Sequence, residues 1–126
     1  MGLRFSELCI DAHDPETLGA WWSKALGWPA HTDSDGDVIL TPPSGTGPTW
    51  LFAPVPEGKV VKNRVHPDFT PDDQQAEVDR LISLGARHVD VGQGDETWVV
   101  LADPEGNEFC VLAAEEPGDT RPCQAR

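Results

Sequence analysis

Apolar residues recur at helical intervals in two segments of the chain. The first segment starts with Asp14 and Pro15, which suit the cap and first turn of a helix, and Gly27 follows its end. Its apolar residues are Leu18, Trp21, Trp22, Ala25 and Leu26. The second segment follows residues 70–73 and stops at Gly85, and its apolar residues are Val78, Leu81 and Ile82. Each pattern predicts a helix that packs one face against a sheet.

Short apolar segments bounded by turn residues predict the strands. Asp35 and Gly36 are typical of a hairpin turn, and residues 103–106 have the preferred residues of a type I turn. The predicted strands are residues 3–11, 37–41 and 49–53 in the first half and 64–69, 86–91, 96–102 and 107–114 in the second. The hairpin turn at Asp35 and Gly36 implies one more strand before it. The first half therefore reads as a βαβββ unit, and the second half starts the same order again.

The two halves align with each other as an internal repeat. The corresponding pairs are Glu7 with His66, Asp14 with Asp73 and, to within one residue, Gly27 with Gly85. Each half is too small to bury its own sheet, so we expect two modules of one domain, residues 3–54 and 63–114 within 1–115. We expect the polar tail, 116–126, to be disordered.

Strand alternation decides which polar groups point away from the helices. Val65 and Phe69 are expected to face the second helix. The polar residues left on the other faces are Glu7, Arg64, His66, Asp68, Glu108 and Cys110. If the sheets curl into a cup, a carboxylate, an imidazole and a thiol converge there, beside an aromatic wall that includes Trp50 or Phe52 and Trp98. These groups suit metal ligands, polar anchors of a ligand pocket, or buried polar residues without a ligand.

The amino-acid composition indicates which classes of binding partner are disfavoured. The 126 residues include 9 Lys and Arg and 22 Asp and Glu, a net charge of −13, which disfavours nucleic acid and anionic membranes and suits a cationic ligand. No apolar run is long enough to span a membrane, and the first residues do not resemble a signal peptide. Three cysteines without CxxC spacing indicate reduced thiols, and we expect a cytoplasmic protein.

Two stretches carry a resemblance to a known family. Residues 63–66, Asn-Arg-Val-His, open the second half, and residues 103–109, Asp-Pro-Glu-Gly-Asn-Glu-Phe, precede the last strand. Together with the order of elements over 3–114, they resemble the vicinal oxygen chelate (VOC) superfamily, in its glyoxalase-like branch with bleomycin resistance proteins and extradiol dioxygenases. The resemblance implies an α+β fold in which two βαβββ modules form a cupped, largely antiparallel sheet with the helices outside. It also implies a homodimer.

The resemblance also implies where a divalent metal would bind. Ligands in metal-dependent members come from the first and last strands of each module, which gives Glu7, His66 and Cys110 as ligands for Zn, Ni, Fe, Mn or Co. Cys110 stands where a glutamate is usual. The fourth position falls near Phe52 or Ala53, and neither side chain can ligate a metal.

Three functions follow from this comparison. Because one ligand is missing, we favour a metal-free cup that binds a small cationic or aromatic molecule. Its expected ligand-binding residues are Trp50, Phe52, Arg64, Trp98 and Glu108. The alternatives are a metal-dependent lyase, isomerase or dioxygenase that uses Glu7 and His66, and a metal-free enzyme with one of these two as general base. The sequence does not decide whether the protein is an enzyme.

Overall fold

The chain divides into two compact units, residues 1–60 and 61–126. The computed structural model describes residues 2–44 and 46–115. In each unit the order of elements is strand, helix and three strands, as the repeat predicts. The predicted modules, residues 3–54 and 63–114, each lie within one unit. The expected disorder of 116–126 concerns a segment outside the described residues.

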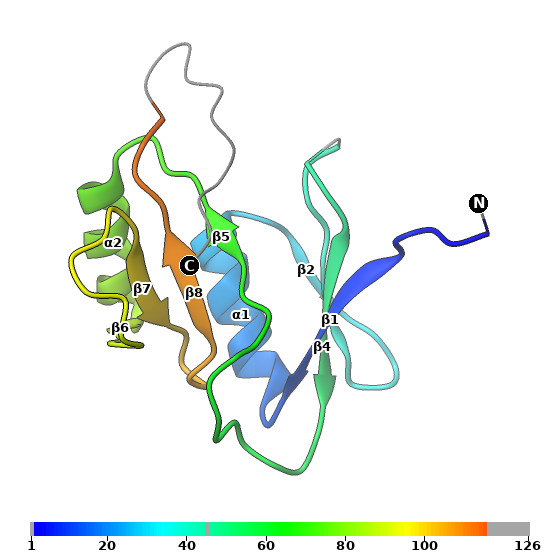
Figure 1. Ribbon diagram of the computed structural model, residues 1–126. Helices are drawn as coiled ribbons and strands as arrows, with labels where there is room; N and C mark the ends of the chain where they lie inside the picture. Colours follow the sequence, from blue (N-terminus) through cyan, green and yellow to red (C-terminus); the bar gives the residue numbers. More distant parts are fainter. Residues whose placement is uncertain (1, 45, 116–126) are drawn as a thin grey trace. The chain divides into compact units, whose positions relative to one another are not determined.

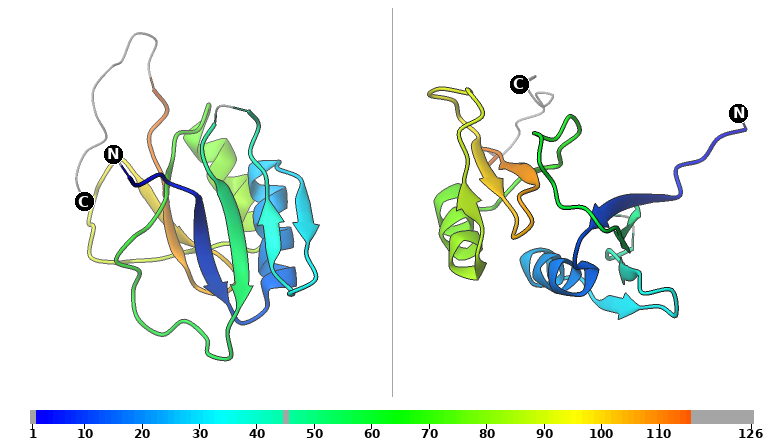
Figure 2. Two further views of the ribbon diagram at one scale, coloured as in Figure 1. Left: turned by 90° about the vertical axis from the view of Figure 1, so that its right-hand side faces the viewer. Right: turned by 90° about the horizontal axis from the view of Figure 1, so that it is seen from below.

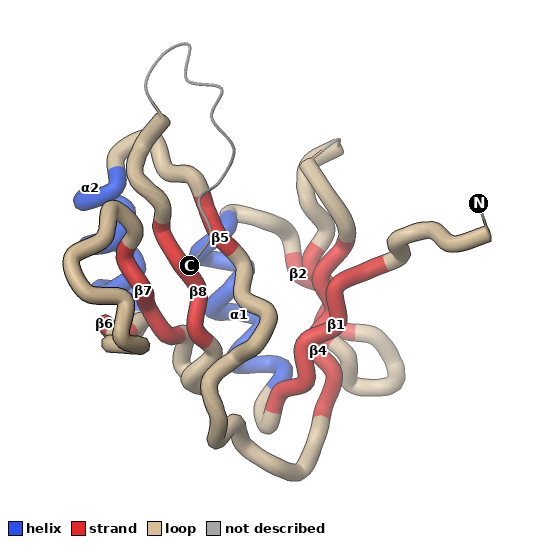
Figure 3. Tube along the Cα trace, viewed as in Figure 1, coloured by secondary structure: helices blue, strands red, loops and turns tan. Residues whose placement is uncertain are grey.

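The first unit has a four-stranded sheet with α1 on one face (Figures 1 and 3). The strand order is β1-β4-β3-β2, in which β1 and β4 are parallel and the other neighbours antiparallel. The elements are β1 (Glu7–Ala12), α1 (Pro15–Leu26), β2 (Ala30–Thr32), β3 (Val38–Leu40) and β4 (Thr49–Pro54). The hairpin predicted at Asp35 and Gly36 is confirmed by the antiparallel pairing of β2 with β3.

Large apolar side chains fill the space between α1 and this sheet. The ring centroids of Trp22 on α1 and Trp50 on β4 lie 5.3 Å apart. Leu18, Leu40 and Phe52 are completely buried. Four of the five predicted apolar positions of α1 are buried, which confirms that this helix packs through one face.

The second unit repeats this topology with shorter strands. Its elements are β5 (Asp68–Phe69), α2 (Gln74–Leu84), β6 (Arg87–His88), β7 (Val99–Ala102) and β8 (Glu108–Val111). The strand order is β5-β8-β7-β6, with β5 and β8 parallel, and α2 lies against one face of the sheet (Figure 2). Phe109 and Val111 are buried on that face, and the rings of Phe69 and Phe109 lie 5.9 Å apart.

The two helices begin and end at equivalent capping residues. The carboxylates of Asp14 and Asp73 accept hydrogen bonds from Thr17 N and Ala76 N, so each is an N-cap. Gly27 and Gly85 follow the helices with φ of 70° and 119°, a region that favours glycine. The repeat deduced from these positions is therefore confirmed.

Several predicted strand limits are wrong. β1 begins at Glu7 rather than residue 3, and Leu3 is 91% exposed. Only Asp68 and Phe69 of the segment 64–69 form a strand, and Val65, expected to face α2, is 82% exposed. Pro67 has no N–H for a ladder, so the pairing starts where Cys110 N donates to the Pro67 carbonyl (3.0 Å).

Two further details concern the helices. Ile82, predicted on the apolar face of α2, is 37% exposed, whereas Val78 and Leu81 are buried as expected. Among the described residues, no helix has the length and apolar character needed to cross a membrane.

Candidate functional site

The second unit contains a pocket of about 480 Å³, a volume within the usual range for small-molecule sites. The segment before β5, the loop between β6 and β7, and strands β7 and β8 form its walls. The lining residues are Lys62, His66, Val91, Gly92, Gln93, Glu96, Trp98, Val100, Glu108 and Cys110.

Strand alternation brings three of these side chains onto the sheet face opposite α2. Val100 on β7 is the cross-strand partner of Cys110 on β8, and both are almost fully buried. Glu108 lies two residues before Cys110 and so shares its face. Phe109, between them, is buried on the helix side. The predicted orientation of Glu108 and Cys110 agrees with this lining.

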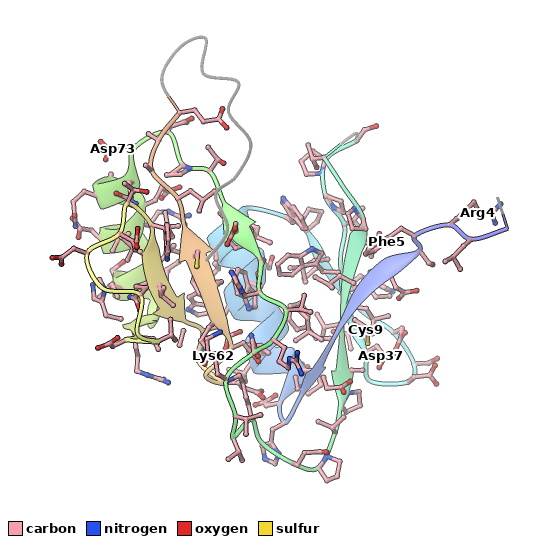
Figure 4. The ribbon with its side chains drawn as sticks, viewed as in Figure 1. Arg4, Phe5, Cys9, Asp37, Lys62 and Asp73 are labelled. Atoms are coloured by element: carbon pink, nitrogen blue, oxygen red, sulfur yellow. The ribbon has the colours of Figure 1, made fainter. Side chains whose placement is uncertain are left out.

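Glu108 also holds the segment that carries His66. Its Oε1 accepts a hydrogen bond from Asn63 N at 2.7 Å, and Asn63 Nδ2 donates to the Glu108 carbonyl at 3.3 Å. The ammonium group of Lys62 donates to the Asn63 carbonyl at 3.1 Å, and Figure 4 shows Lys62 on this segment. A carboxylate of β8 therefore fixes one wall of the pocket as well as lining it.

The turn between β7 and β8 sets where Glu108 begins its strand. The buried carboxylate of Asp103 accepts hydrogen bonds from Glu105 N and Asn107 N, both at 3.0 Å. Gly106 N donates to the Asp103 carbonyl at 2.9 Å, which confirms the predicted turn. Gly106 has φ 88°, where a side chain would strain the backbone.

Side-chain amides hold the wall that includes Trp98. Gln74, the first residue of α2, donates through Nε2 to the carbonyls of Thr97 (2.8 Å) and Val111 (3.1 Å). Gln93 accepts from Val91 N at 2.8 Å. Gln74 of α2 thus links Thr97 to Val111 at the end of β8. The half-buried indole of Trp98 directly follows Thr97 in the sequence.

His66, Asp68 and Cys110 form a cluster of potential metal ligands. One donor atom from each lies within 4.8 Å of the others. His66 Nε2 and Asp68 Oδ1 are 3.3 Å apart, and Asp68 and Cys110 are register partners across β5 and β8. An imidazole, a carboxylate and a thiolate can together hold a divalent cation. The cluster fits the kind of group that the resemblance implies, with Asp68 as its carboxylate.

Three of the other predicted site residues belong to the first unit. Trp50 and Phe52 are buried between α1 and the sheet of the first unit, and neither lines the pocket. Glu7 is exposed at the start of β1 in the first unit. Arg64 is exposed and is not among the lining residues.

The pairing register of β1 with β4 corrects the predicted position of the fourth metal ligand. Cys9 pairs with Leu51 in the first unit as Asp68 pairs with Cys110 in the second. The counterpart of Cys110 is therefore Leu51, and not Phe52 or Ala53 as the sequence comparison placed it. Leucine cannot ligate a metal either, so the missing ligand remains missing.

Sequence analysis did not include Gln93 and Glu96 in the site, and it assigned Asp68 no role. The loop residues carry no recognisable motif. Asp68, in contrast, follows His66 by two residues, and the alternation of side chains would have added it to the candidate ligands.

The helix-free face of the first unit is acidic. Partial burial, followed by the charges of Asp11, Glu7 and Asp37, raises the pKa of the Cys9 thiol. Burial and the neighbouring carboxylates of Asp33 and Asp35 raise the pKa of Asp37. Figure 4 labels Cys9 and Asp37 on this unit.

Asp33, Asp35 and Asp37 are a second group of carboxylates with donor atoms close together. Asp33 Oδ1 accepts from Asp35 N (2.9 Å) and Asp37 N (3.0 Å), the same pattern that Asp103 makes in its turn. The hydrogen bonds to the backbone of this turn therefore explain why an aspartate stands at position 33.

Comparison with known proteins places this geometry in a family. Residues 7–112 match the family model of the glyoxalase-like domain. Among solved structures, a glyoxalase/bleomycin resistance protein/dioxygenase family enzyme from Burkholderia phytofirmans PsJN is 15% identical, with TM-score 0.66 over 84% of this chain and 94% of that one. The fosfomycin resistance protein FosX from Mesorhizobium loti is 14% identical, with TM-score 0.67 over 91% and 94% of the two chains.

A third similar structure is a bleomycin resistance determinant encoded on the transposon Tn5. It is 17% identical, with TM-score 0.59 over 90% of this chain and 100% of that chain. No curated protein matches the sequence. At these identities the structures establish the fold, whereas the family model covers most of the chain. The chain therefore belongs to the glyoxalase-like domain family, and it has the fold of the glyoxalase/bleomycin resistance/dioxygenase proteins that the resemblance implied.

Proposed function

We propose that this glyoxalase-like protein binds a small aromatic cation in the pocket of its second unit and needs no metal to do so. The observation that carries the proposal is the pocket of about 480 Å³, whose lining combines the Trp98 indole with the carboxylates of Glu96 and Glu108. An indole face and nearby carboxylates both attract a cation. The net charge of −13 favours the approach of the same ligands.

Lys62 is the basic residue of the lining, against two carboxylates. Its ammonium donates to the Asn63 carbonyl. We therefore expect cations to bind more tightly than neutral or anionic molecules of the same size.

The test is calorimetric titration of the whole chain with three bicyclic probes of similar size: 1-methylquinolinium, quinoline and naphthalene-1-sulfonate. The expected order of affinity is cation, neutral molecule, anion. Replacing Trp98→Leu or Glu108→Gln should weaken binding of the cation by about two- to fivefold each. Glu57→Gln, an exposed charge in the first unit, is the matched control and should leave the affinity unchanged.

Two results would contradict the proposal. One is equal affinity for the sulfonate and the quinolinium. The other is binding of the quinolinium that neither pocket variant changes. Glu108→Gln also alters the hydrogen bond from Asn63 N to Glu108. Glu96→Gln removes a carboxylate charge from the pocket without changing that bond, so it measures the effect of charge on affinity separately.

A second candidate function is a metal-dependent enzyme of the lyase, isomerase or dioxygenase type, and the cluster of His66, Asp68 and Cys110 favours it. A bound divalent cation would act as a Lewis acid on the oxygens of a substrate. The residues that would hold it include His66 and Cys110, which line the pocket. A role for Glu7, as ligand or base, stays a prediction.

Elemental analysis of protein purified without a metal-affinity tag tests this candidate. About one Zn, Ni, Fe, Mn or Co per chain, bound at a site with open positions, would support it. No metal, even after incubation with these ions, would exclude it. The homodimer and the cytoplasmic location stay predictions from the sequence.

A further inference from the structure

We infer that His66, Asp68 and Cys110 form a complete three-residue site for zinc or a similarly soft divalent cation within the second unit, with Asp68 as the carboxylate ligand. The inference rests on the metal-dependent candidate function and assigns its ligands. It differs from the set that the sequence resemblance implied, because it does not require Glu7 of the first unit.

The positions of the three donors follow from strand pairing. Asp68 and Cys110 are partners in the parallel register of β5 and β8, so their side chains emerge next to each other on one face. His66 lies just before β5, and one of its ring nitrogens is within 4.8 Å of donor atoms of Asp68 and Cys110. Strand pairing thus sets the carboxylate beside the thiol, and the segment that leads into β5 adds the imidazole.

The backbone around the ligands is fixed before any metal binds. Pro67 stands between His66 and Asp68, restricts its own φ and keeps His66 out of the helical region. Its carbonyl accepts from Cys110 N at 3.0 Å, and the Phe69 carbonyl accepts from Leu112 N at 2.8 Å. The ligand-bearing strands are thus tied to each other on both sides of the site.

One donor separation already matches that of a tetrahedral zinc site. Bonds of about 2.0 to 2.3 Å place two ligand atoms about 3.3 to 3.8 Å apart. His66 Nε2 and Asp68 Oδ1 are already 3.3 Å apart, and all three donors lie within 4.8 Å. The remaining donor separations are at most 4.8 Å, about 1 Å more than the upper value for such a site.

Burial and ligand type indicate the metal and its open position. The side chains of His66 and Asp68 are 26% and 21% exposed, whereas Cys110 is 3% exposed, so the thiol forms the floor. Because His66 and Cys110 line the pocket, a fourth ligand would come from a molecule bound there. A thiolate with an imidazole favours Zn²⁺ or Co²⁺ over Mg²⁺ or Mn²⁺.

Titration of the untagged full chain with Co²⁺ tests the inference by absorption spectroscopy. We expect one Co²⁺ per chain, intense visible bands of a tetrahedral site, and a near-ultraviolet band from sulfur-to-cobalt charge transfer. Zn²⁺ should displace the ion and Mg²⁺ should not. A chain with Cys9→Ser and Cys123→Ser should keep the charge-transfer band, which assigns the sulfur to Cys110 even if Cys110→Ser fails to fold.

Two charge-neutralising variants then distinguish the ligand sets. Asp68→Asn should lower Co²⁺ affinity at least about tenfold, as loss of a direct ligand does. Glu7→Gln should stay within about twofold of the parent chain, and so should Asp79→Asn, an exposed control on α2. Circular dichroism confirms that each variant is folded.

Three outcomes would overturn the inference: absence of the charge-transfer band, full Co²⁺ affinity in Asp68→Asn, or a loss in Glu7→Gln as large as that in Asp68→Asn. Binding of 1-methylquinolinium to the metal-free chain is measured on the same preparation. That measurement separates failure of the metal site from failure of small-molecule binding.

Discussion

Gly19 lies in the middle of α1 and packs closely against Val38 of β3. A methyl group at Gly19 would come within 2.5 Å of Val38 Cγ1 and 2.9 Å of Val38 Cβ. Rotation about χ1 of Val38 moves Cγ1 but leaves Cβ in place, so the helix and the strand would have to separate. Glycine is required here by the close approach and not by its φ angle.

Two effects oppose each other in Gly19→Ala, and their magnitudes decide the outcome. Helix propensity favours alanine by about 1 kcal/mol. Overpacking of a buried contact costs about 1 to 3 kcal/mol, and the fixed position of Val38 Cβ places this contact toward the upper part of that range. We expect the free energy of unfolding to fall by about 1 to 2 kcal/mol.

Urea unfolding followed by tryptophan fluorescence measures this change, because four of the five tryptophans lie in residues 1–60. The exposed neighbour Ala20 supplies the control: Ala20→Gly should cost about 1 kcal/mol through propensity alone. In the double variant Gly19→Ala with Val38→Ala, loss of Cγ1 removes the 2.5 Å contact but leaves Cβ, and this partial relief should give a coupling energy of about 1 kcal/mol. A rise in stability for Gly19→Ala, with no coupling to Val38, would refute the close packing.

The remaining predictions concern capping and titration. Asp73→Ala should lower the free energy of unfolding by about 1 kcal/mol in urea, because α2 loses its N-cap, and an unchanged midpoint would contradict the cap. Burial, and then the charge of Asp11, raise the pKa of the Cys9 thiol. Iodoacetamide should therefore alkylate Cys9 more slowly than a free cysteine peptide at mildly alkaline pH. Equal rates, or no acceleration in Asp11→Asn, would argue against this. Hydrogen bonds from Thr17 lower the pKa of Asp14, so its contribution is complete above the ordinary carboxyl pKa of about 3.9 and is lost as pH falls through the lowered value. The difference in urea midpoint between the parent chain and Asp14→Ala should therefore shrink in acid, and a constant difference would refute the linkage.

Local chemistry made the helices and the repeat predictable. Asp14 and Asp73 cap their helices because a short carboxylate reaches the free N–H groups of the first turn. Strand limits were less predictable, because hydrogen bonds between distant segments set them. β5 shrinks to Asp68 and Phe69 because Pro67 cannot donate to a ladder and because β8 pairs only with the residues that follow it.

Sequence alternation bears on part of the candidate site. His66, Glu108 and Cys110, which alternation groups away from the helices, all line the pocket of the second unit. Of the three aromatic residues expected to form a wall, Trp98 lines the pocket, whereas Trp50 and Phe52 pack under α1 in the first unit. Gln93 and Glu96 enter the site through a loop whose path depends on its own hydrogen bonds, such as that from Val91 N to Gln93.

The duplicated scaffold predicts how many ligands each chain binds. Where the second unit has His66, Asp68 and Cys110, the register gives the first unit Glu7, Cys9 and Leu51. Leu51 cannot donate to a metal or hydrogen-bond a ligand, so the first face lacks the third donor. The two units thus share a topology but differ in the side chains at these three positions. Of the two sets, that of His66, Asp68 and Cys110 has three donor atoms close together. Co²⁺ should therefore saturate at one ion per chain, and two equivalent ions would mean that the acidic face around Cys9 also binds metal.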